Sequence, residues 1–367
     1  MWDLTEFRKE LKELVNIDSC SSDRDDVARI GELLAGKYRD IGLYVETHAG
    51  CTCIQAKTHP DTDFDVLLVG HMDTVFPRGT AGKRSYREDE SYAYGPGVAD
   101  MKAGLVMILH LVRKLRKTNP GLRICIANDG DEETDSILSY EWLKELSGHA
   151  RYAYVFEPGR PGNGFVKSRK GYLGIEIDFN GISAHAGNAP EKGASAIREM
   201  ARWITELTAL QNLEIGTSVN AGTVNGGISP NVIADHANVY FDVRIRQMPE
   251  LLRIKEKVQE LQKNISVEGV TASVKYISEM TPMSPTEITD RMIEHITQKA
   301  EELHMEISWF CVGGVSDANH LAGWGVPVIC GCGPCGGNLH SEEEFLELFS
   351  LENRLELMFQ VLADLSV

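Results

Sequence analysis

Short, nearly continuous apolar runs alternate with amphipathic segments in the first half of the chain. The runs at residues 66–69, 124–127 and 154–156 suit strands that are buried on both faces of a mainly parallel sheet. A mainly helical segment over residues 11–37 precedes them. Between the first two runs, apolar residues recur at the spacing of a crossover helix: Leu105, Val106, Ile108, Leu109, Val112 and Leu115. The pattern predicts an α/β domain.

The pattern changes near Ser168. Apolar and polar residues then alternate over residues 173–179 and 239–245, the period of strands with one solvated face. Helical patterns follow at residues 194–210 and 251–261, which predicts a separate two-layer α+β unit. Pro282 and Pro285 mark its end. We therefore predict one domain built from residues 1–167 and 282–367, interrupted by a second domain at 168–281.

Composition and charge narrow the class of protein. The 367 residues are 43% hydrophobic and 25% charged, the composition of an ordinary soluble globular protein. The net charge of −17, with no basic patch, argues against nucleic-acid binding. No apolar run approaches the ~20 residues that cross a bilayer, and the first residues do not resemble a signal peptide. We expect a cytoplasmic protein with no membrane partner.

Eight cysteines are scattered along the chain. Cys330, Cys332 and Cys335 form a C-x-C-x-x-C run, but a run without a matching second cluster is a weak metal signal. A chain of this length does not need disulfide bonds for stability. Reduced structural thiols are the favoured interpretation.

Acidic and imidazole side chains follow each predicted buried strand. His71 and Asp73 follow the first run, residues 131–133 (Asp-Glu-Glu) the second, and Glu157 the third. Ligands collect at the carboxyl ends of strands in open α/β sheets, so these groups should converge. Asp100, in a turn-rich segment, and His340, in a glycine-rich loop, add further candidates. Imidazoles with carboxylates suit zinc, and a bridging carboxylate would give a two-metal site.

Several segments resemble motifs of the M20 metallopeptidase family, in particular its glutamate carboxypeptidase branch. The resemblance covers nearly the whole chain and rests on ordered motifs: residues 71–75 (HMDTV), 95–102 (GPGVADMK), 131–133 (DEE), 156–158 (FEP), 183–187 (SAHAG), 230–233 (PNVI) and 339–341 (LHS). It implies a catalytic domain with two zinc ions per chain, for which cobalt can substitute. The inserted domain would be a lid that also forms a homodimer, because its half-solvated sheet would gain from pairing edges across a two-fold axis.

The resemblance also assigns metal ligands. His71 and Glu157 would bind one zinc, Glu133 and His340 would bind the other, and Asp100 would bridge the two. The peptide bond after Asp100 is cis in the family.

Two further residues take catalytic roles by resemblance. Asp73 would hydrogen-bond the His71 ring and fix its tautomer. Glu132 would be the general base. We expect Glu132 and Glu133 to lie in an extended segment, so that their side chains point apart and do not compete.

Three residues of the inserted domain take roles by resemblance. His185 would stabilise the oxyanion in the active site of the partner subunit. Asn231 and Arg244 would hold the free carboxylate of the substrate, for which a guanidinium fork is suited. From the residues alone, Arg244 lies on the polar face of a strand, and its guanidinium must reach either water or a ligand.

The functional hypothesis is zinc-dependent hydrolysis of an amide bond beside a free carboxylate, with release of a C-terminal amino acid from a peptide. The alternative is an N-acyl-amino-acid deacylase of the acetylornithine or succinyl-diaminopimelate type. In the family, Glu rather than Asp at position 157 accompanies both activities. A non-catalytic metal-binding scaffold is the alternative from another class, but it would have no need of Glu132.

Overall fold

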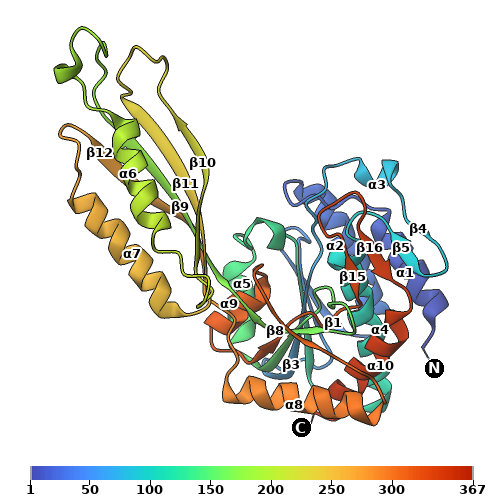
Figure 1. Cartoon of the computed structure of the whole chain (residues 1–367). Helices are drawn as coiled ribbons and strands as arrows, with labels where there is room; N and C mark the ends of the chain where they lie inside the picture. The colour runs from blue at the N-terminus through green and yellow to red at the C-terminus, as the bar shows by residue number, and fades with distance from the viewer. Residues whose placement is uncertain (1, 366–367) are drawn as a thin grey trace. The chain divides into compact units, whose positions relative to one another are not determined.

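The computed structural model describes residues 2–365, which form two compact units. Unit 1 comprises Met1–Ser168, Pro285–Val312 and Ser316–Val367, apart from the terminal residues outside the described range. Unit 2 comprises Arg169–Ser284 and Gly313–Val315. Each unit has its own hydrophobic core, and Figure 1 labels the helices and strands that surround these cores.

A six-stranded sheet in the order β1-β2-β6-β3-β7-β14 forms the centre of unit 1. The pairs β3–β6, β3–β7 and β7–β14 are parallel, whereas β1–β2 and β2–β6 are antiparallel. The prediction of a mixed α/β fold with a mainly parallel sheet is confirmed. The six strands are β1 (Tyr44–His48), β2 (Cys53–Lys57), β3 (Phe64–His71), β6 (Ile124–Asp129), β7 (Ala150–Val155) and β14 (Val328–Ile329).

The predicted crossover helix between the first two parallel strands is α4 (Ala103–Thr118), and its apolar stripe is buried. The N-terminal helical segment is two helices, because the chain turns over residues 16–23, where Asp23 caps the second of them. The other helices of unit 1 are α1 (Leu4–Val15), α2 (Arg24–Asp40), α3 (Thr80–Lys83), α5 (Tyr140–Ser147), α8 (Glu287–Glu302), α9 (Asp317–Gly323) and α10 (Ser350–Ala363).

A small four-stranded sheet in the order β15-β16-β5-β4 lies beside this core. It brings the segments that carry Asp100 and His340 close together, because β5 and β16 are antiparallel neighbours, with Tyr94 opposite Phe345. The strands are β4 (Arg87–Glu88), β5 (Tyr92–Tyr94), β15 (Gly336–Gly337) and β16 (Phe345–Glu347). A separate two-stranded ribbon pairs β8 (Phe165–Arg169) with β13 (Trp309–Val312).

Unit 2 is an antiparallel sheet in the order β10-β11-β9-β12, covered by two helices. The alternation in the sequence corresponds to β9 (Gly171–Asn180) and β11 (His236–Ile245), whose apolar residues are buried while their polar neighbours remain partly exposed. Helices α6 (Ala196–Thr208) and α7 (Met248–Lys263) contribute Trp203 and Ile254 to the same core. The remaining strands are β10 (Ser218–Gly226) and β12 (Thr271–Met280).

Within the described residues, no helix combines the length and the apolar character that a membrane crossing needs.

Candidate metal centre

Three parallel strands carry acidic or imidazole groups to one edge of the central sheet. β3 ends at His71, β6 leads into the loop of Glu132 and Glu133, and β7 leads into Glu157. Because neighbouring parallel strands end at the same edge, these side chains lie close together. Asp100 and His340 come to them from two loops of the same unit.

Asp100 lies between two histidines. Its Oδ1 is 3.3 Å from His71 Nε2, and its Oδ2 is 3.2 Å from His340 Nε2. Glu157 Oε1 lies 3.7 Å from the same His71 nitrogen, and Glu133 Oε2 lies 3.3 Å from the same His340 nitrogen. Each oxygen of Asp100 therefore faces the Nε2 atom of one imidazole, and a glutamate carboxylate also approaches each of these two nitrogens.

Asp73 fixes the orientation of the His71 ring. His71 Nδ1 lies 3.1 Å from the Asp73 carbonyl oxygen and 3.3 Å from its Oδ1. Because both of these atoms are acceptors, Nδ1 carries a proton, and Nε2 is the nitrogen that faces Asp100 and Glu157. The other carboxylate oxygen of Asp73 accepts the backbone N–H of Glu133 at 3.2 Å. Asp73 thus holds two candidate ligands in place at once.

The density of carboxylates shifts the ionisation of the cluster. Hydrogen bonds to Asp100 and Glu133 raise the pKa of His340 to about 10. Burial would lower the pKa of His71, but its hydrogen bonds to Asp100 and Asp73 raise it well above its usual value. Burial raises the pKa of Glu132, and the nearby charge of Glu157 adds to this effect. The cluster therefore has a strong excess of negative potential that favours cations.

Glu132 and Glu133 do not lie in an extended segment. They form a 3-10 turn, Glu132–Thr134, and both carboxylates lie within 4.8 Å of each other and of a His71 ring nitrogen. The expectation that their side chains point apart was wrong, because the chain turns sharply after β6 and Asp135 adopts a left-handed conformation. Both glutamates are partly exposed and can reach the same small volume.

The donor set fits divalent cations. His71, Asp100 and Glu157 form one group, and Asp100, Glu133 and His340 form another. Within each group the donor atoms lie within 4.8 Å of one another, close enough for the three side chains to hold one ion. Nitrogen and carboxylate oxygen donors suit zinc, and the two groups share only Asp100. Among the described residues, no candidate group contains a cysteine.

The loop that carries Asp100 has a buried partner that the sequence pattern did not reveal. Glu344 accepts the backbone N–H groups of Gly97, Ala99 and Asp100 at 2.9–3.0 Å. The peptide bond after Asp100 is cis, as the resemblance implied. Glu344 is the last of three consecutive glutamates, and such a run would ordinarily be assigned to a solvated surface. In the sequence, only its spacing of four residues from His340 indicated that Glu344 lies near the metal centre.

Two of the predicted site residues lie together on unit 2. The His185 backbone forms a bridge with Val232, and the Ala186 N–H donates to the Asn231 carbonyl oxygen at 2.9 Å. His185 is exposed, and its Nδ1 accepts the N–H groups of Gly187 and Asn188, both at 3.1 Å. An Nδ1 that accepts carries no proton, so in the neutral ring Nε2 is a free donor.

Arg244, also on unit 2, is partly exposed and pairs with an acidic residue on its own strand. Its Nε and one terminal nitrogen donate to the two carboxylate oxygens of Asp242, both at 2.9 Å. The guanidinium also lies 4.3 Å from the centroid of the Tyr172 ring. The expectation of water or a ligand therefore omitted a third possibility, a partner on the same face of the strand.

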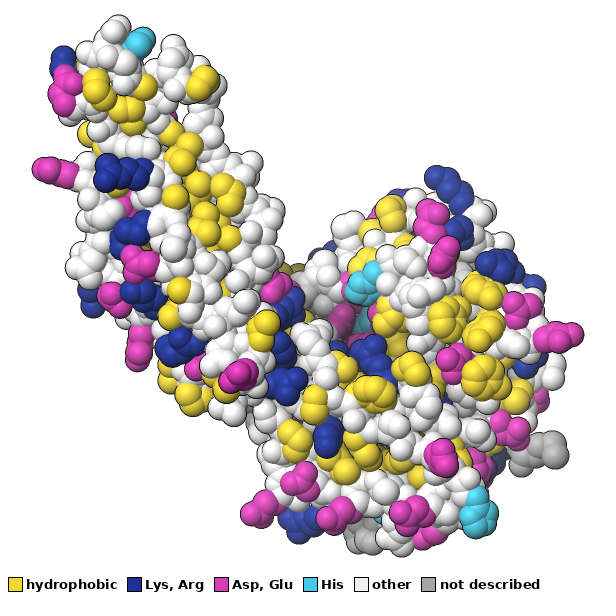
Figure 2. All heavy atoms as spheres, in the orientation of Figure 1, with side chains coloured by type: hydrophobic (Ala, Val, Ile, Leu, Met, Phe, Trp, Pro, Cys, Tyr) yellow, Lys and Arg dark blue, Asp and Glu magenta, His cyan; other side chains and the backbone are white. Residues whose placement is uncertain are grey.

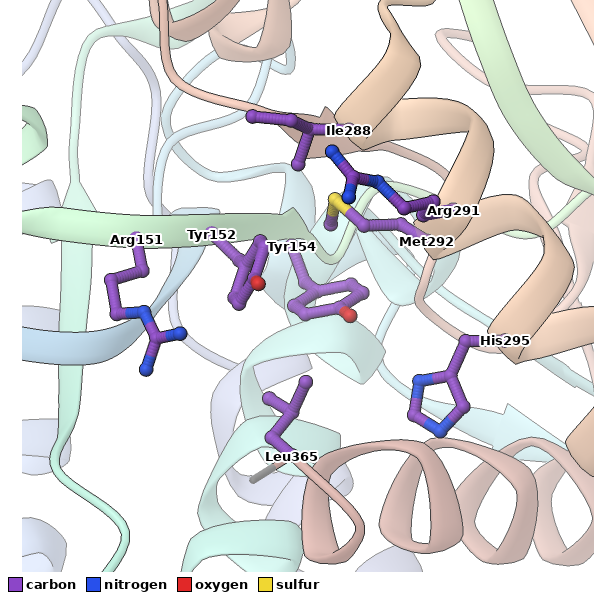
Figure 3. Close-up of a pocket in the computed structure, with 8 residues that line it drawn as sticks. All are labelled: Arg151, Tyr152, Tyr154, Ile288, Arg291, Met292, His295 and Leu365. Carbon is purple, nitrogen blue, oxygen red and sulfur yellow. The ribbon is translucent and has the colours of Figure 1, made fainter. Parts of the chain in front are cut away.

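A separate cavity of about 390 Å³ lies between β7 and α8 of unit 1. It is lined by Arg151, Tyr152, Tyr154, Ile288, Arg291, Met292, His295 and Leu365 (Figure 3). None of these residues belongs to the cluster around Asp100, and the lining contains no carboxylate. The cavity therefore contributes nothing to the candidate metal centre.

Comparison with known proteins identifies the family. Residues 67–364 match peptidase family M20/M25/M40. The chain belongs to this family. Carboxypeptidase G2 of Pseudomonas sp. is 26% identical over 97% of this chain and 88% of its own length. Acetylornithine deacetylase of Proteus mirabilis is 25% identical over 81% of this chain and 78% of its own length.

A solved structure supports the fold. Aminopeptidase PepT of Bacillus cereus superimposes with a TM-score of 0.79 and 24% identity, covering 97% of both chains. The M20 relatives include peptidases and deacylases, so membership shows a metal-dependent type of hydrolase and leaves its substrate open.

Proposed function

We propose that this M20 enzyme is a two-zinc hydrolase that cleaves an amide bond beside a free carboxylate and releases a C-terminal amino acid. The observation that carries the proposal is the position of Asp100, with one oxygen 3.3 Å from His71 and the other 3.2 Å from His340. A carboxylate in this position can serve two cations at once.

The chain's own residues divide the tasks of such a centre. His71 and Glu157 would hold one zinc ion, Glu133 and His340 the other, and Asp100 both. Cobalt can take the place of zinc, since it accepts the same donors. Bound zinc would supply Lewis acidity to the scissile amide.

Glu132 is the proton carrier in this proposal. Its carboxylate lies beside the two ligand groups without being needed to complete either of them. It would accept a proton from the water that attacks the amide carbon and then donate a proton to the departing amine. Asp73 keeps the His71 ring in the orientation that presents Nε2 to the centre.

The inserted unit would supply recognition. The free Nε2–H of His185 suits donation to the oxyanion that develops on the substrate, in the active site of the partner subunit. Asn231 and Arg244 would bind the substrate carboxylate. The Asn231 side-chain oxygen already accepts from Ser229 Oγ at 2.6 Å, which leaves its amide N–H groups to donate.

A homodimer through unit 2 is the assembly we propose. β10 is an edge strand, exposed over most of its length, and Val224 on it is 50% exposed. Figure 2 shows apolar side chains gathered along this part of unit 2. An edge of this kind gains from pairing across a two-fold axis. Light scattering at assay concentration should give the mass of two chains, and the mass of one chain would contradict the proposal.

We place the enzyme in the cytoplasm. Thiols such as Cys53, Cys125 and Cys332 are not oxidised to disulfides, which fits a reducing compartment. Cys330, Cys332 and Cys335 are buried, and burial raises the pKa of the Cys332 thiol, so they are structural thiols in this proposal.

The second candidate is an N-acyl-amino-acid deacylase, favoured by the 25% identity to acetylornithine deacetylase. Both activities place a free carboxylate beside the scissile amide, and only the acyl side of the substrate differs.

Metal analysis and a substrate panel test the proposal together. Elemental analysis after zinc reconstitution should approach two ions per chain, and a content that stays at zero would refute the metal centre. The panel compares peptides that end in a free carboxylate with N-acetyl and N-succinyl amino acids, each assayed beside its carboxamide. Release of the C-terminal amino acid from peptides supports the carboxypeptidase, whereas turnover of the acyl amino acids alone identifies the deacylase.

A further inference from the structure

Glu344 connects the two loops that bring Asp100 and His340 to the metal centre. These loops extend from neighbouring strands of the small sheet, since β5 precedes the Asp100 loop and β16 follows the His340 loop. Glu344 is the residue immediately before β16. Its carboxylate contacts the backbone of the other loop, at residues 97–100.

The carboxylate of Glu344 accepts hydrogen bonds from three backbone N–H groups of residues 97–100. Its Oε2 accepts the Gly97 N–H at 3.0 Å. Its Oε1 accepts the Ala99 N–H at 2.9 Å and the Asp100 N–H at 3.0 Å. Glu344 is 1% exposed, so water does not compete for these donors. A buried N–H group left without an acceptor is destabilising, so these three bonds favour the observed conformation of the turn.

These hydrogen bonds help to position Asp100, which is shared by the two candidate ligand groups. One of the three N–H groups belongs to Asp100 itself, whose two carboxylate oxygens must face two histidines. Loss of the acceptor would free the Asp100 backbone to rotate, and its side chain would lose the position that both ligand groups share. Glu344 also lies only four residues beyond His340. Its hydrogen bonds therefore link the His340 loop to the Asp100 turn.

We propose that Glu344 is a positioning residue for the metal centre, which sets the affinity of the centre for its cations without touching them. The inference rests on the proposed two-metal function. Because Glu344 acts on the conformation of the Asp100 turn, we expect its substitution to weaken metal binding while the protein remains folded.

Three substitutions separate positioning from general stability. Glu344→Gln keeps the shape but offers one acceptor oxygen in place of two, so it cannot satisfy all three N–H groups. Glu344→Asp keeps the charge but is one methylene shorter. The matched controls are Glu342→Gln and Glu343→Gln, which remove the same charge from exposed neighbours in the same run.

The zinc dissociation constant of each variant decides the proposal. It is measured by competition with a chromophoric chelator, at a temperature where circular dichroism shows that every variant is folded. Substitution of residues that hold metal ligands typically weakens metal binding by about ten- to a hundredfold, which is the loss expected for Glu344→Gln. Glu344→Asp should lie between Glu344→Gln and the wild type, and the two controls should match the wild type.

The outcomes distinguish this inference from the proposed function. A wild-type protein that binds no zinc would overturn the metal centre itself. A wild type with two zinc ions and a Glu344→Gln variant of equal affinity would overturn only the positioning role, even if that variant melts at a lower temperature. Should Glu344→Gln fail to fold, Glu344→Asp carries the same comparison.

Discussion

Replacing Glu132 by glutamine should lower kcat by about 10²–10⁴-fold while the metal content stays at the wild-type value. This range is what a positioned general base contributes, because the amide cannot accept the proton that the carboxylate takes. The side chains have the same shape, and neither candidate ligand group that contains Asp100 requires Glu132. Steady-state kinetics and elemental analysis of the same preparation measure the two quantities.

The adjacent residue provides the matched control. Glu133 lies 3.3 Å from His340 Nε2 and belongs to the group that includes Asp100. Glu133→Gln should therefore weaken metal binding, and its activity should recover in part at high zinc concentration. Glu132→Gln should not recover, whatever the zinc concentration. A Glu132→Gln variant within threefold of the wild type would show that another group accepts the proton.

The apolar pattern was sufficient to predict the core of each unit. Apolar runs without alternation predicted the parallel strands β3, β6 and β7, because a strand buried on both faces has apolar residues at successive positions. Strict alternation predicted β9 and β11, because a strand buried on one face has apolar residues at every second position. The antiparallel pairing of β1 and β2 with β6 left no such trace. It depends on contacts between distant segments that no local pattern records.

Some residues of the candidate site could be predicted from the sequence, and others could not. Ligands at strand ends follow from topology, so His71 and Glu157 could be placed before the structure was known. The 3-10 turn at Glu132 depends on a left-handed residue at Asp135, which local patterning did not indicate. Glu344 could not be separated from Glu342 and Glu343, because only the fold determines which of three identical residues is buried.

The Asp242–Arg244 pair was available from the sequence. Residues two apart on a strand share a face, so an acid and a base at this spacing can pair. The structure shows a two-bond fork with both distances at 2.9 Å. This geometry changes the expected behaviour of Arg244, because a guanidinium that is already held by a carboxylate is oriented before any substrate arrives.

Arg244→Ala should reduce kcat/KM by about ten- to a hundredfold for substrates with a free carboxylate. The loss corresponds to one charge-assisted hydrogen bond of ~1.5–3 kcal/mol. Three of the five guanidinium N–H donors are not used by the two bonds to Asp242, so a substrate carboxylate can bind without breaking the fork. Arg244→Lys should recover only part of the activity, because an ammonium cannot make the paired contact.

The decisive control is a substrate whose terminal carboxylate has been converted to an amide. The wild type should discriminate strongly against it, and Arg244→Ala should discriminate much less. Asp242→Asn separates orientation from recognition: it leaves the guanidinium charge but weakens the fork, so it should retain the discrimination at a lower kcat/KM. If the wild type and Arg244→Ala discriminate equally, Arg244 serves only its ion pair with Asp242 and its contact with Tyr172, and the substrate carboxylate is bound elsewhere.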